Sequence, residues 1–333
     1  MKITFFSAKP YDKTFFDRFN QDHGFELEYQ ETHLGPHSVD LVKNAEAVCV
    51  FVNDKLTAPV LEALAQKGVQ IIALRCAGFN NTDLEAAKRL GLAVCRVPAY
   101  SPEAVAEHAV AMLLTINRKT HKAYNRVREQ NFSLNGLLGS NLHDKTAGVI
   151  GTGKIGKAFT RIMQGFGCKV LAYDIHPDEA LTGTGVEYLP LTDLLRQSDI
   201  ISLHCPLTPQ NHYLVNRETL SLMKPGVTIV NTSRGGLINT ADIIEALKTK
   251  QVGALCIDVY EQEEKLFFRD LSSHIIDDDL IQRLMSFPNV LITGHQGFFT
   301  SDALAAIAAT TLENLRSFED QGQALHALPA AQG

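Results

Sequence analysis

Three glycines at a fixed spacing constrain this chain more than any other feature. Gly151, Gly153 and Gly156 follow the apolar run GVI and precede a helix-like stretch that leads to a second apolar run, KVLAYD. In such a unit the first glycine permits a tight turn, the second lets the backbone approach a pyrophosphate, and the third lets helix and strand pack closely. The N-terminus of the helix offers free N–H groups and a positive dipole to phosphates. The pattern therefore predicts a strand–helix–strand unit that binds a dinucleotide.

Asp174, which ends the second apolar run, distinguishes between the two nicotinamide cofactors. A carboxylate at this place can accept hydrogen bonds from both ribose hydroxyls, but it repels a 2′-phosphate. The next residues, Ile175, His176 and Pro177, include no arginine that would offset the repulsion. The sequence therefore favours NAD over NADP. The alternative is that Asp174 is a plain turn residue before Pro177.

Length and composition indicate two cores and no polyanionic partner. A core seldom grows as one unit beyond roughly 250 to 300 residues, and this chain has 333. Its net charge of −6, with 45% hydrophobic and 20% charged residues, gives no basic excess that would suggest nucleic acid or a membrane surface. No apolar run approaches the roughly 20 residues of a membrane span, and the N-terminal residues lack a secretion signal. A cytoplasmic location is expected.

The cysteines do not form a metal or disulfide pattern. There are six of them, mostly inside apolar strand-like runs and without CxxC pairs. We expect buried free thiols and no metal site. They are Cys49, Cys76, Cys95, Cys168, Cys205 and Cys256.

The order of elements predicts an α/β fold of two doubly wound parallel-sheet domains. Residues 1–100 alternate strand-like and helix-like segments, which is typical of a parallel sheet with helices on both faces. An unbroken helix is expected from about residue 101, and six strands follow from the glycine motif onward: GVIG, KVLAYD, DIISLHC, TIVNTS, ALCIDV and NVLITG. We expect a discontinuous, flavodoxin-like substrate domain, a Rossmann NAD domain and a cleft between them. The expected substrate domain is 1–100 with 297–333, the NAD domain is 101–296, and 324–333 is a frayed tail.

Three polar side chains follow different strands of the second expected sheet. They are Arg234 in NTSRGG, Glu263 in YEQEE and His295 in TGHQ. Ligands bind beyond the carboxyl ends of such strands, so these side chains can meet. Arginine holds a carboxylate, histidine exchanges a proton near neutral pH, and glutamate beside it stabilises the protonated ring. This set suits hydride transfer to a 2-oxo acid. Each residue has a plain alternative as an ion-pair or packing partner.

The glutamate assignment stays open on pattern alone. Glu261 and Glu264 lie in the same segment as Glu263 and carry the same carboxylate.

The chain resembles the D-isomer-specific 2-hydroxyacid dehydrogenases, and among them the fermentative D-lactate dehydrogenases. The resemblance extends over essentially the whole chain through FVND, RCAGFNN, VPAYSPEAVAEHA, VIGTGKIG, SLHCPLTPQNHYLVN, VNTSRGGLI, DVYEQE and TGHQGFFT. It implies catalysis by Arg234, Glu263 and His295, and so selects Glu263 among the three glutamates.

The same resemblance implies further contacts. Backbone N–H groups at Ala77 and Gly78 would bind the substrate carboxylate together with Arg234. Tyr100 and Phe298 would line the side-chain pocket, with interdomain packing as their alternative role. The implied NAD contacts, beyond the three glycines, are Lys154, Ile155, Asp174, Cys205, Pro206, Asn211, Thr232, Ser233 and Asp258. For Asn211 a loop cap is an equal alternative.

The expected activity is reduction of pyruvate to D-lactate with NADH. A larger 2-oxo acid, such as phenylpyruvate, is one alternative. An NAD-sensing protein similar to transcriptional corepressors is another. Glu263 argues against a formate dehydrogenase, because those enzymes carry glutamine at this position. A phosphorylated substrate is also disfavoured, because the expected substrate-binding segments contain no basic residue beyond Arg75. A homodimer or homotetramer is expected, through the long helix and the segment after it.

Overall fold

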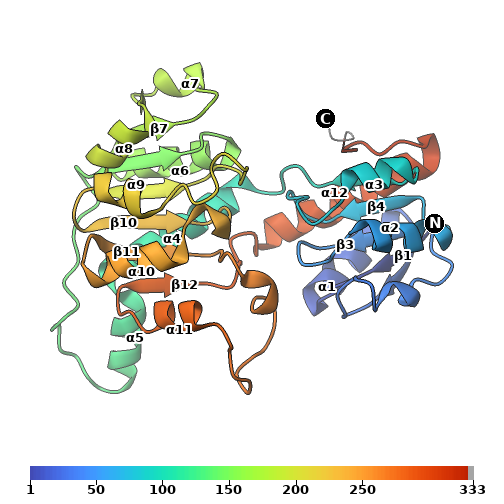
Figure 1. The fold of residues 1–333 in the computed structure, drawn as a ribbon, viewed down its shortest axis with the longest axis horizontal. Helices are drawn as coiled ribbons and strands as arrows, with labels where there is room; N and C mark the ends of the chain where they lie inside the picture. The colour runs from blue at the N-terminus through green and yellow to red at the C-terminus, as the bar shows by residue number, and fades with distance from the viewer. Residues whose placement is uncertain (329–333) are drawn as a thin grey trace. The chain divides into compact units, whose positions relative to one another are not determined.

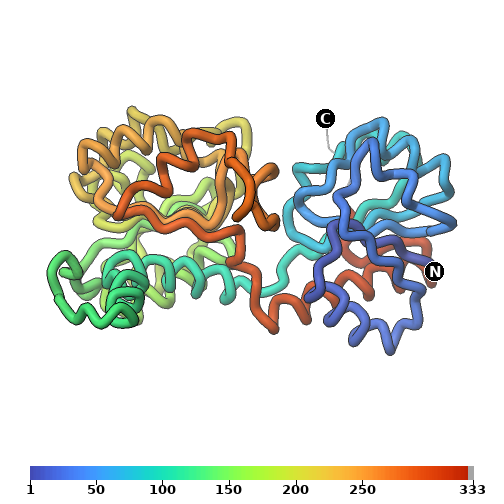
Figure 2. The backbone as a smooth tube through the Cα atoms, turned by 90° about the horizontal axis from the view of Figure 1, so that it is seen from below, coloured from blue at the N-terminus to red at the C-terminus, as the bar shows by residue number. Residues whose placement is uncertain are grey.

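The structure is a computed structural model that describes residues 1–328. The chain folds into two compact units, one formed by Met1–Ser101 together with the segment from Phe298 onward, the other by Pro102–Gly297 (Figure 1). These boundaries differ by one residue from those expected. In both views the C-terminal helix, drawn in red, lies with the blue strands of the first unit (Figure 2).

The first unit is a five-stranded parallel sheet in the order β2-β1-β3-β4-β5. This is the flavodoxin-like order, with its switch point between β1 and β3. Its strands are short and mostly buried, as expected for a sheet covered by helices on both faces. They are β1 (Lys2–Phe5), β2 (Glu26–Tyr29), β3 (Ala47–Val50), β4 (Ile71–Leu74) and β5 (Ala93–Arg96). The helices are α1 (Pro10–Phe19), α2 (Ala58–Gln66), α3 (Leu84–Arg89) and α12 (Ser301–Gln321).

The segment after α12 is not frayed over 324–328, which corrects one expectation. Ala324 is buried, Ala327 forms an antiparallel bridge with Cys95, and the N–H of Leu328 donates to the carbonyl of Val94 at 2.8 Å. The segment therefore covers the unpaired edge of β5, which would otherwise expose its backbone groups. The rest of the expected tail, 329–333, lies outside the described residues.

The second unit is a seven-stranded parallel sheet in the order β12-β11-β10-β9-β6-β7-β8. This is the Rossmann order with one added strand. The strands are β6 (Thr146–Ile150), β7 (Lys169–Tyr173), β8 (Glu187–Tyr188), β9 (Ile200–Leu203), β10 (Val227–Asn231), β11 (Val252–Ile257) and β12 (Val290–Ile292). The main helices are α4 (Pro102–Arg118), α5 (Thr120–Arg128), α6 (Lys154–Gly165), α8 (Leu191–Gln197), α9 (Arg217–Leu222), α10 (Thr240–Lys248) and α11 (Asp279–Met285). A short helix, α7 (Glu179–Thr182), precedes β8.

The long helix expected from residue 101 is interrupted, which is a second correction. Lys119 has a left-handed backbone (φ 52°) and separates α4 from α5. The buried apolar face of α4 ends at Ile116, whereas α5 has no buried residue. Because nothing on α5 packs into the core, continued packing does not hold the helix straight.

The described residues offer neither a membrane span nor a metal cluster. No helix within residues 1–328 combines the length and apolar character needed to cross a bilayer. In the same range, no group of three or more His, Cys, Asp or Glu side chains could hold a metal ion. All six cysteines are free, and five of them are buried.

Candidate active site

The glycine loop has the geometry that a pyrophosphate requires. Gly151 has a φ of 94°, and a Cβ there would lie 2.5 Å from the nitrogen of Cys205. A Cβ on Gly156 would lie 1.9 Å from the carbonyl oxygen of Gly151. A Cβ on Gly153 would meet nothing within 4 Å, so a ligand can approach the backbone there. Since α6 begins at Lys154, its N-terminal N–H groups lie at this open position.

Asp174 follows β7 and is held as an anion beside the loop. Its Oδ2 accepts hydrogen bonds from Thr152, at 2.6 Å from the backbone N–H and 3.1 Å from the hydroxyl. Its Oδ1 accepts the N–H of His176 at 2.9 Å. Burial alone would raise the pKa of Asp174, but the hydrogen bonds from His176 and Thr152 hold this pKa below its usual value. The carboxylate therefore suits a ribose diol, and it also caps the turn before Pro177.

Two of the other expected cofactor contacts have unpaired polar atoms. The hydroxyl of Thr232 is buried and has no hydrogen-bond partner within residues 1–328. The side chain of Lys154 is exposed and forms no ion pair in the same part of the chain. Both groups are thus available to a ligand, and the site fits a dinucleotide.

The loop after β9 is already fastened by its own hydrogen bonds. Asn211 donates to the carbonyl of Pro206 at 2.7 Å and accepts the N–H of Thr208 at 2.7 Å. The hydroxyl of Ser233 donates to the carbonyl of Cys205 at 2.5 Å. Asn211 therefore acts as a loop cap, the alternative role considered for it. Cys205 is half-buried, and burial raises the pKa of its thiol to about 11.

His295 and Glu263 form a hydrogen-bonded pair. The Nδ1 of His295 lies 2.8 Å from the Oε1 of Glu263, and their side chains are 20% and 18% exposed. A carboxylate only accepts, so Nδ1 carries the proton of this bond. The second oxygen of Glu263 accepts the N–H of Tyr260 at 2.9 Å. The Nε2 of His295 is therefore the ring nitrogen left to exchange a proton.

The neighbouring carboxylates have other surroundings. Glu261 accepts the hydroxyl of Tyr213 at 2.8 Å, and Glu264 is exposed. The geometry thus pairs Glu263 with His295, as the resemblance implies.

Arg234 lies just after β10, beside the loops that follow β11 and β12 in the sheet order. Its Nη1 donates to the carbonyl of Ser233 at 2.7 Å. Across the described residues Arg234 forms no ion pair, so the surface-pair alternative is not realised. The loop is packed closely against its neighbour, because a Cβ on Gly235 would lie 2.1 Å from the carbonyl carbon of Tyr260.

Asp258 supports the loop that carries His295. It is 1% exposed, and its two oxygens accept the N–H groups of Gln296 and Gly297, each at 2.8 Å. The hydroxyl of Thr293 and the Nε2 of His108, 3.3 Å away, complete its surroundings. Burial would raise the pKa of Asp258, but hydrogen bonds from His108, Thr293 and Gln296 lower it.

Sequence reasoning missed His108. It lies on α4, far from Asp258 in the sequence, and on the helix it resembles any other half-buried residue.

In the first unit, the turn after β4 leaves backbone donors free. The N–H groups of Ala77 and Gly78 have no acceptor within residues 1–328. Phe298 is buried, and its ring centroid lies 6.4 Å from that of Tyr100 and 5.7 Å from that of Phe51. Tyr100 and Phe298 thus belong to one aromatic group within this unit.

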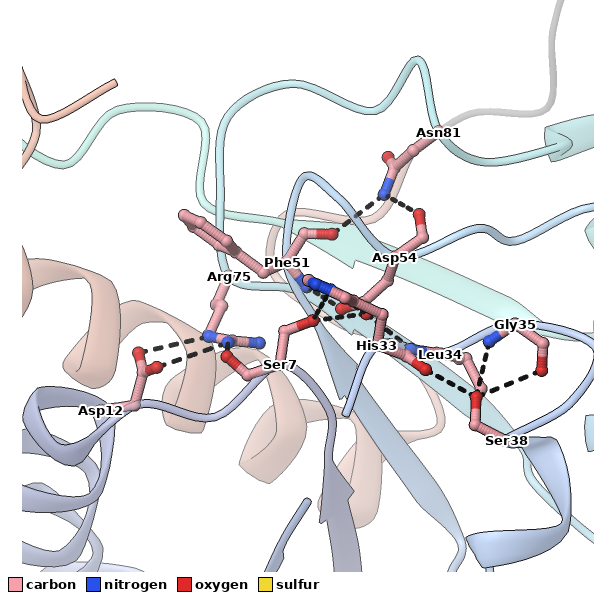
Figure 3. A network of polar contacts seen from close by, with 10 residues as sticks. All are labelled: Ser7, Asp12, His33, Leu34, Gly35, Ser38, Phe51, Asp54, Arg75 and Asn81. Carbon is pink, nitrogen blue, oxygen red and sulfur yellow. Dashed lines mark hydrogen bonds and ion pairs between the residues drawn. The ribbon is translucent and has the colours of Figure 1, made fainter. Parts of the chain in front are cut away.

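Arg75, at the same sheet edge, is fully buried and committed to internal contacts (Figure 3). Its Nε lies 3.3 Å from Asp12, its Nη2 donates to the carbonyl of Ser7 at 3.0 Å, and its guanidinium lies 5.0 Å from the ring centroid of Phe51. Asp54, also buried, accepts the Ser7 hydroxyl at 2.7 Å. Arg75 is therefore part of the core, and its Nη1 is buried without a hydrogen-bond partner within residues 1–328.

Comparison with known proteins shows which family the chain is similar to. Residues 110–297 match the family model described as D-isomer specific 2-hydroxyacid dehydrogenase, NAD binding domain. A D-lactate dehydrogenase of Escherichia coli (strain K12) is 54% identical, over 96% of this chain and 97% of that protein.

Solved structures similar to this one include other 2-hydroxyacid dehydrogenases. The apo-structure of D-lactate dehydrogenase from Escherichia coli has a TM-score of 0.91 at 51% identity, covering 99% of this chain and all of that one. The structure of a D-2-hydroxyisocaproate dehydrogenase has a TM-score of 0.87 at 31% identity, covering 98% of this chain and 99% of that one.

Proposed function

Because the chain belongs to the NAD-dependent D-isomer-specific 2-hydroxyacid dehydrogenases, we propose that it reduces pyruvate to D-lactate with NADH. The observation that carries the proposal is the 2.8 Å hydrogen bond between His295 Nδ1 and Glu263 Oε1. It leaves Nε2 free to protonate a substrate oxygen. A protein that only senses NAD has no need of such a pair.

The proposed roles divide the reaction among three side chains. NADH, when bound, supplies the hydride that reaches the carbonyl carbon. His295 gives the Nε2 proton to the carbonyl oxygen, and Glu263 stabilises the protonated ring beforehand. Arg234 forms no ion pair within residues 1–328, so its guanidinium is available to bind the substrate carboxylate and polarise the carbonyl.

Two features support a small, phosphate-free substrate. The aromatic group of Phe51, Tyr100 and Phe298 fills space at the proposed side-chain pocket. Arg75 is buried against Asp12. We therefore place pyruvate ahead of phenylpyruvate and of phosphorylated acids. On the cofactor side, the proposed contacts are those expected from the glycine loop, Asp174 and the loops after β9 and β10.

We further propose a homo-oligomer in a reducing compartment, the cytoplasm. The segment from α5 to residue 138 exposes Tyr124, Phe132, Leu134 and Leu138. Exposed apolar residues gathered in one segment mark association surfaces. The six free cysteines suit a compartment that keeps thiols reduced. Light scattering would distinguish a dimer from a tetramer, and a monomer would contradict the proposal.

The activity is tested by following NADH oxidation with pyruvate, phenylpyruvate and 2-oxoisocaproate, and by resolving the enantiomers of each product. We expect the highest kcat/KM with pyruvate and a D-product. A higher value with phenylpyruvate would assign a larger substrate. NADH binding without turnover of any acid would favour the sensor.

A further inference from the structure

The turn that follows β4 is fastened to the end of β5 by two hydrogen bonds. The carbonyl of Cys76 accepts the N–H of Val97 at 3.2 Å, and the carbonyl of Ala77 accepts a hydrogen bond from Nη1 of Arg96 at 2.7 Å. Both donors come from the end of β5. Two successive peptide carbonyls of the turn therefore point toward the same neighbouring strand.

This arrangement directs the N–H groups of the turn. Peptide bonds in the described residues are all trans, and the N–H of a trans peptide points opposite to its C=O. The N–H of Ala77 shares a peptide with the Cys76 carbonyl, and that of Gly78 shares one with the Ala77 carbonyl. Both N–H groups thus point away from β5. Neither has an acceptor within residues 1–328, and successive free N–H groups form a concave anion site.

Arg96 is itself held in place by contacts of its side chain and of its backbone. Its guanidinium lies 5.2 Å from the ring centroid of Phe79, within cation–π range. Its backbone N–H donates to the carbonyl of His326 at 3.2 Å, and its carbonyl accepts from Asn314 at 3.0 Å. No carboxylate forms an ion pair with it in the described part of the chain. A full positive charge therefore lies behind the turn, on the side opposite its free N–H groups.

We propose that Arg96 is a positioning residue for the substrate carboxylate. By holding the Ala77 carbonyl it aims the Gly78 N–H at the anion, and its charge attracts the same anion through the turn. The inference rests on the proposed function, because it needs a substrate with a carboxylate. It does not make Arg96 a catalytic residue, since the side chain reaches the backbone of the turn and not the reacting atoms.

The test is the Arg96→Met variant, which removes the donor and the charge but keeps an unbranched stem over Phe79. We expect KM for pyruvate and the inhibition constant for oxamate, an unreactive analogue, to rise about tenfold. The carboxylate contact is the same in the ground and transition states, so kcat should stay within about twofold. The dissociation constant of NADH should not change. Arg96→Lys, which keeps a donor and a charge, should lie between wild type and Arg96→Met.

The control is Arg89→Met, which removes an exposed arginine that pairs with Glu62 in the same unit. It should leave every constant unchanged. The inference is overturned if Arg96→Met keeps the wild-type KM. It is also overturned if kcat falls and NADH binding weakens while KM rises. Wild-type activity on the panel of acids is measured first: its absence defeats the proposed function and this inference with it, whereas a normal KM in an active Arg96→Met enzyme defeats this inference alone.

Discussion

His295 adopts a backbone conformation that few residues other than glycine adopt, with a φ of 55°. Such a conformation persists only where the surroundings enforce it. Here Asp258 accepts the next two backbone N–H groups, so the turn is fixed on its C-terminal side. Glu263 fixes the ring from another direction. The imidazole is thereby held before any ligand arrives, which is what a proton donor needs.

Replacing that ring tests its role. His295→Gln should lower turnover about 10²- to 10⁴-fold, the usual contribution of a general acid. NADH binding, followed by cofactor fluorescence, should be nearly unchanged. Glu263→Gln should cause a smaller loss, because it removes the partner and keeps the ring. Near-wild-type turnover in His295→Gln would show that the proton comes from another group.

Asp174 should set the preference for NADH over NADPH. Asp174→Ala should raise the ratio of kcat/KM for NADPH to that for NADH, because it removes the anion that repels a 2′-phosphate. The variant also loses the hydrogen bonds to Thr152, so NADH binding should weaken. An unchanged ratio of the two cofactors would remove Asp174 from the ribose site.

Among the elements, helix α6 can pack closely on the glycine loop only because Gly156 has no Cβ. A Cβ on Gly156 would lie 1.9 Å from the Gly151 carbonyl, and a backbone atom cannot swing aside as a side chain can. Gly156→Ala should therefore push α6 away from β6, abolish NADH binding and lower the free energy of unfolding by about 1–3 kcal/mol.

The same helix supplies the control. A Cβ on Gly165 would meet nothing within 4 Å, and its backbone is helical. Gly165→Ala should bind NADH normally and unfold at an equal or higher temperature. Thermal unfolding and NADH titration of the two variants check the prediction. Equal behaviour would mean that the loop tolerates displacement.

The elements also show how far the sequence predicts the fold. Parallel order and strand positions follow from apolar runs alternating with helical periods, and six strands of the second sheet are predicted in this way. β8 is not predicted, because Glu187–Tyr188 is too short to show an alternating apolar pattern. The break at Lys119 escapes because it depends on where burial ends, which is a tertiary property.

Some residues of the candidate site can likewise be predicted from the sequence, and others cannot. Arg234 and His295 can be proposed from the sequence because each follows a strand of one sheet, whereas Glu263 is selected among three glutamates only by the family resemblance. Arg96 and His108 cannot be proposed in this way, because their partners, Ala77 and Asp258, come near only after folding.

On the scale of the whole molecule, buried carboxylates link stability to pH. The pKa of Asp258 is lowered by folding. Its contribution is therefore complete above the unfolded value, about 3.9, and is lost as the pH falls through the lower folded value. Asp258→Asn should lower the free energy of unfolding by about 2 kcal/mol at neutral pH. Denaturant titrations should show this difference shrinking as the pH falls below the unfolded value of about 3.9, and a constant difference would contradict the assignment.

The first unit is formed by two segments of the chain, one before and one after the second unit in the sequence. Its five strands precede residue 102, while α12, which packs on α1 and β4, follows residue 297. On a ribosome, those strands emerge long before the helix that covers them. The NAD-binding unit is continuous, so it can fold as soon as it leaves the exit tunnel. The sheet that carries Ala77 and Gly78 has to wait, uncovered on that side, until α12 has been synthesised. Nascent chains stalled before α12 should therefore recruit chaperones through the first unit and not through the second.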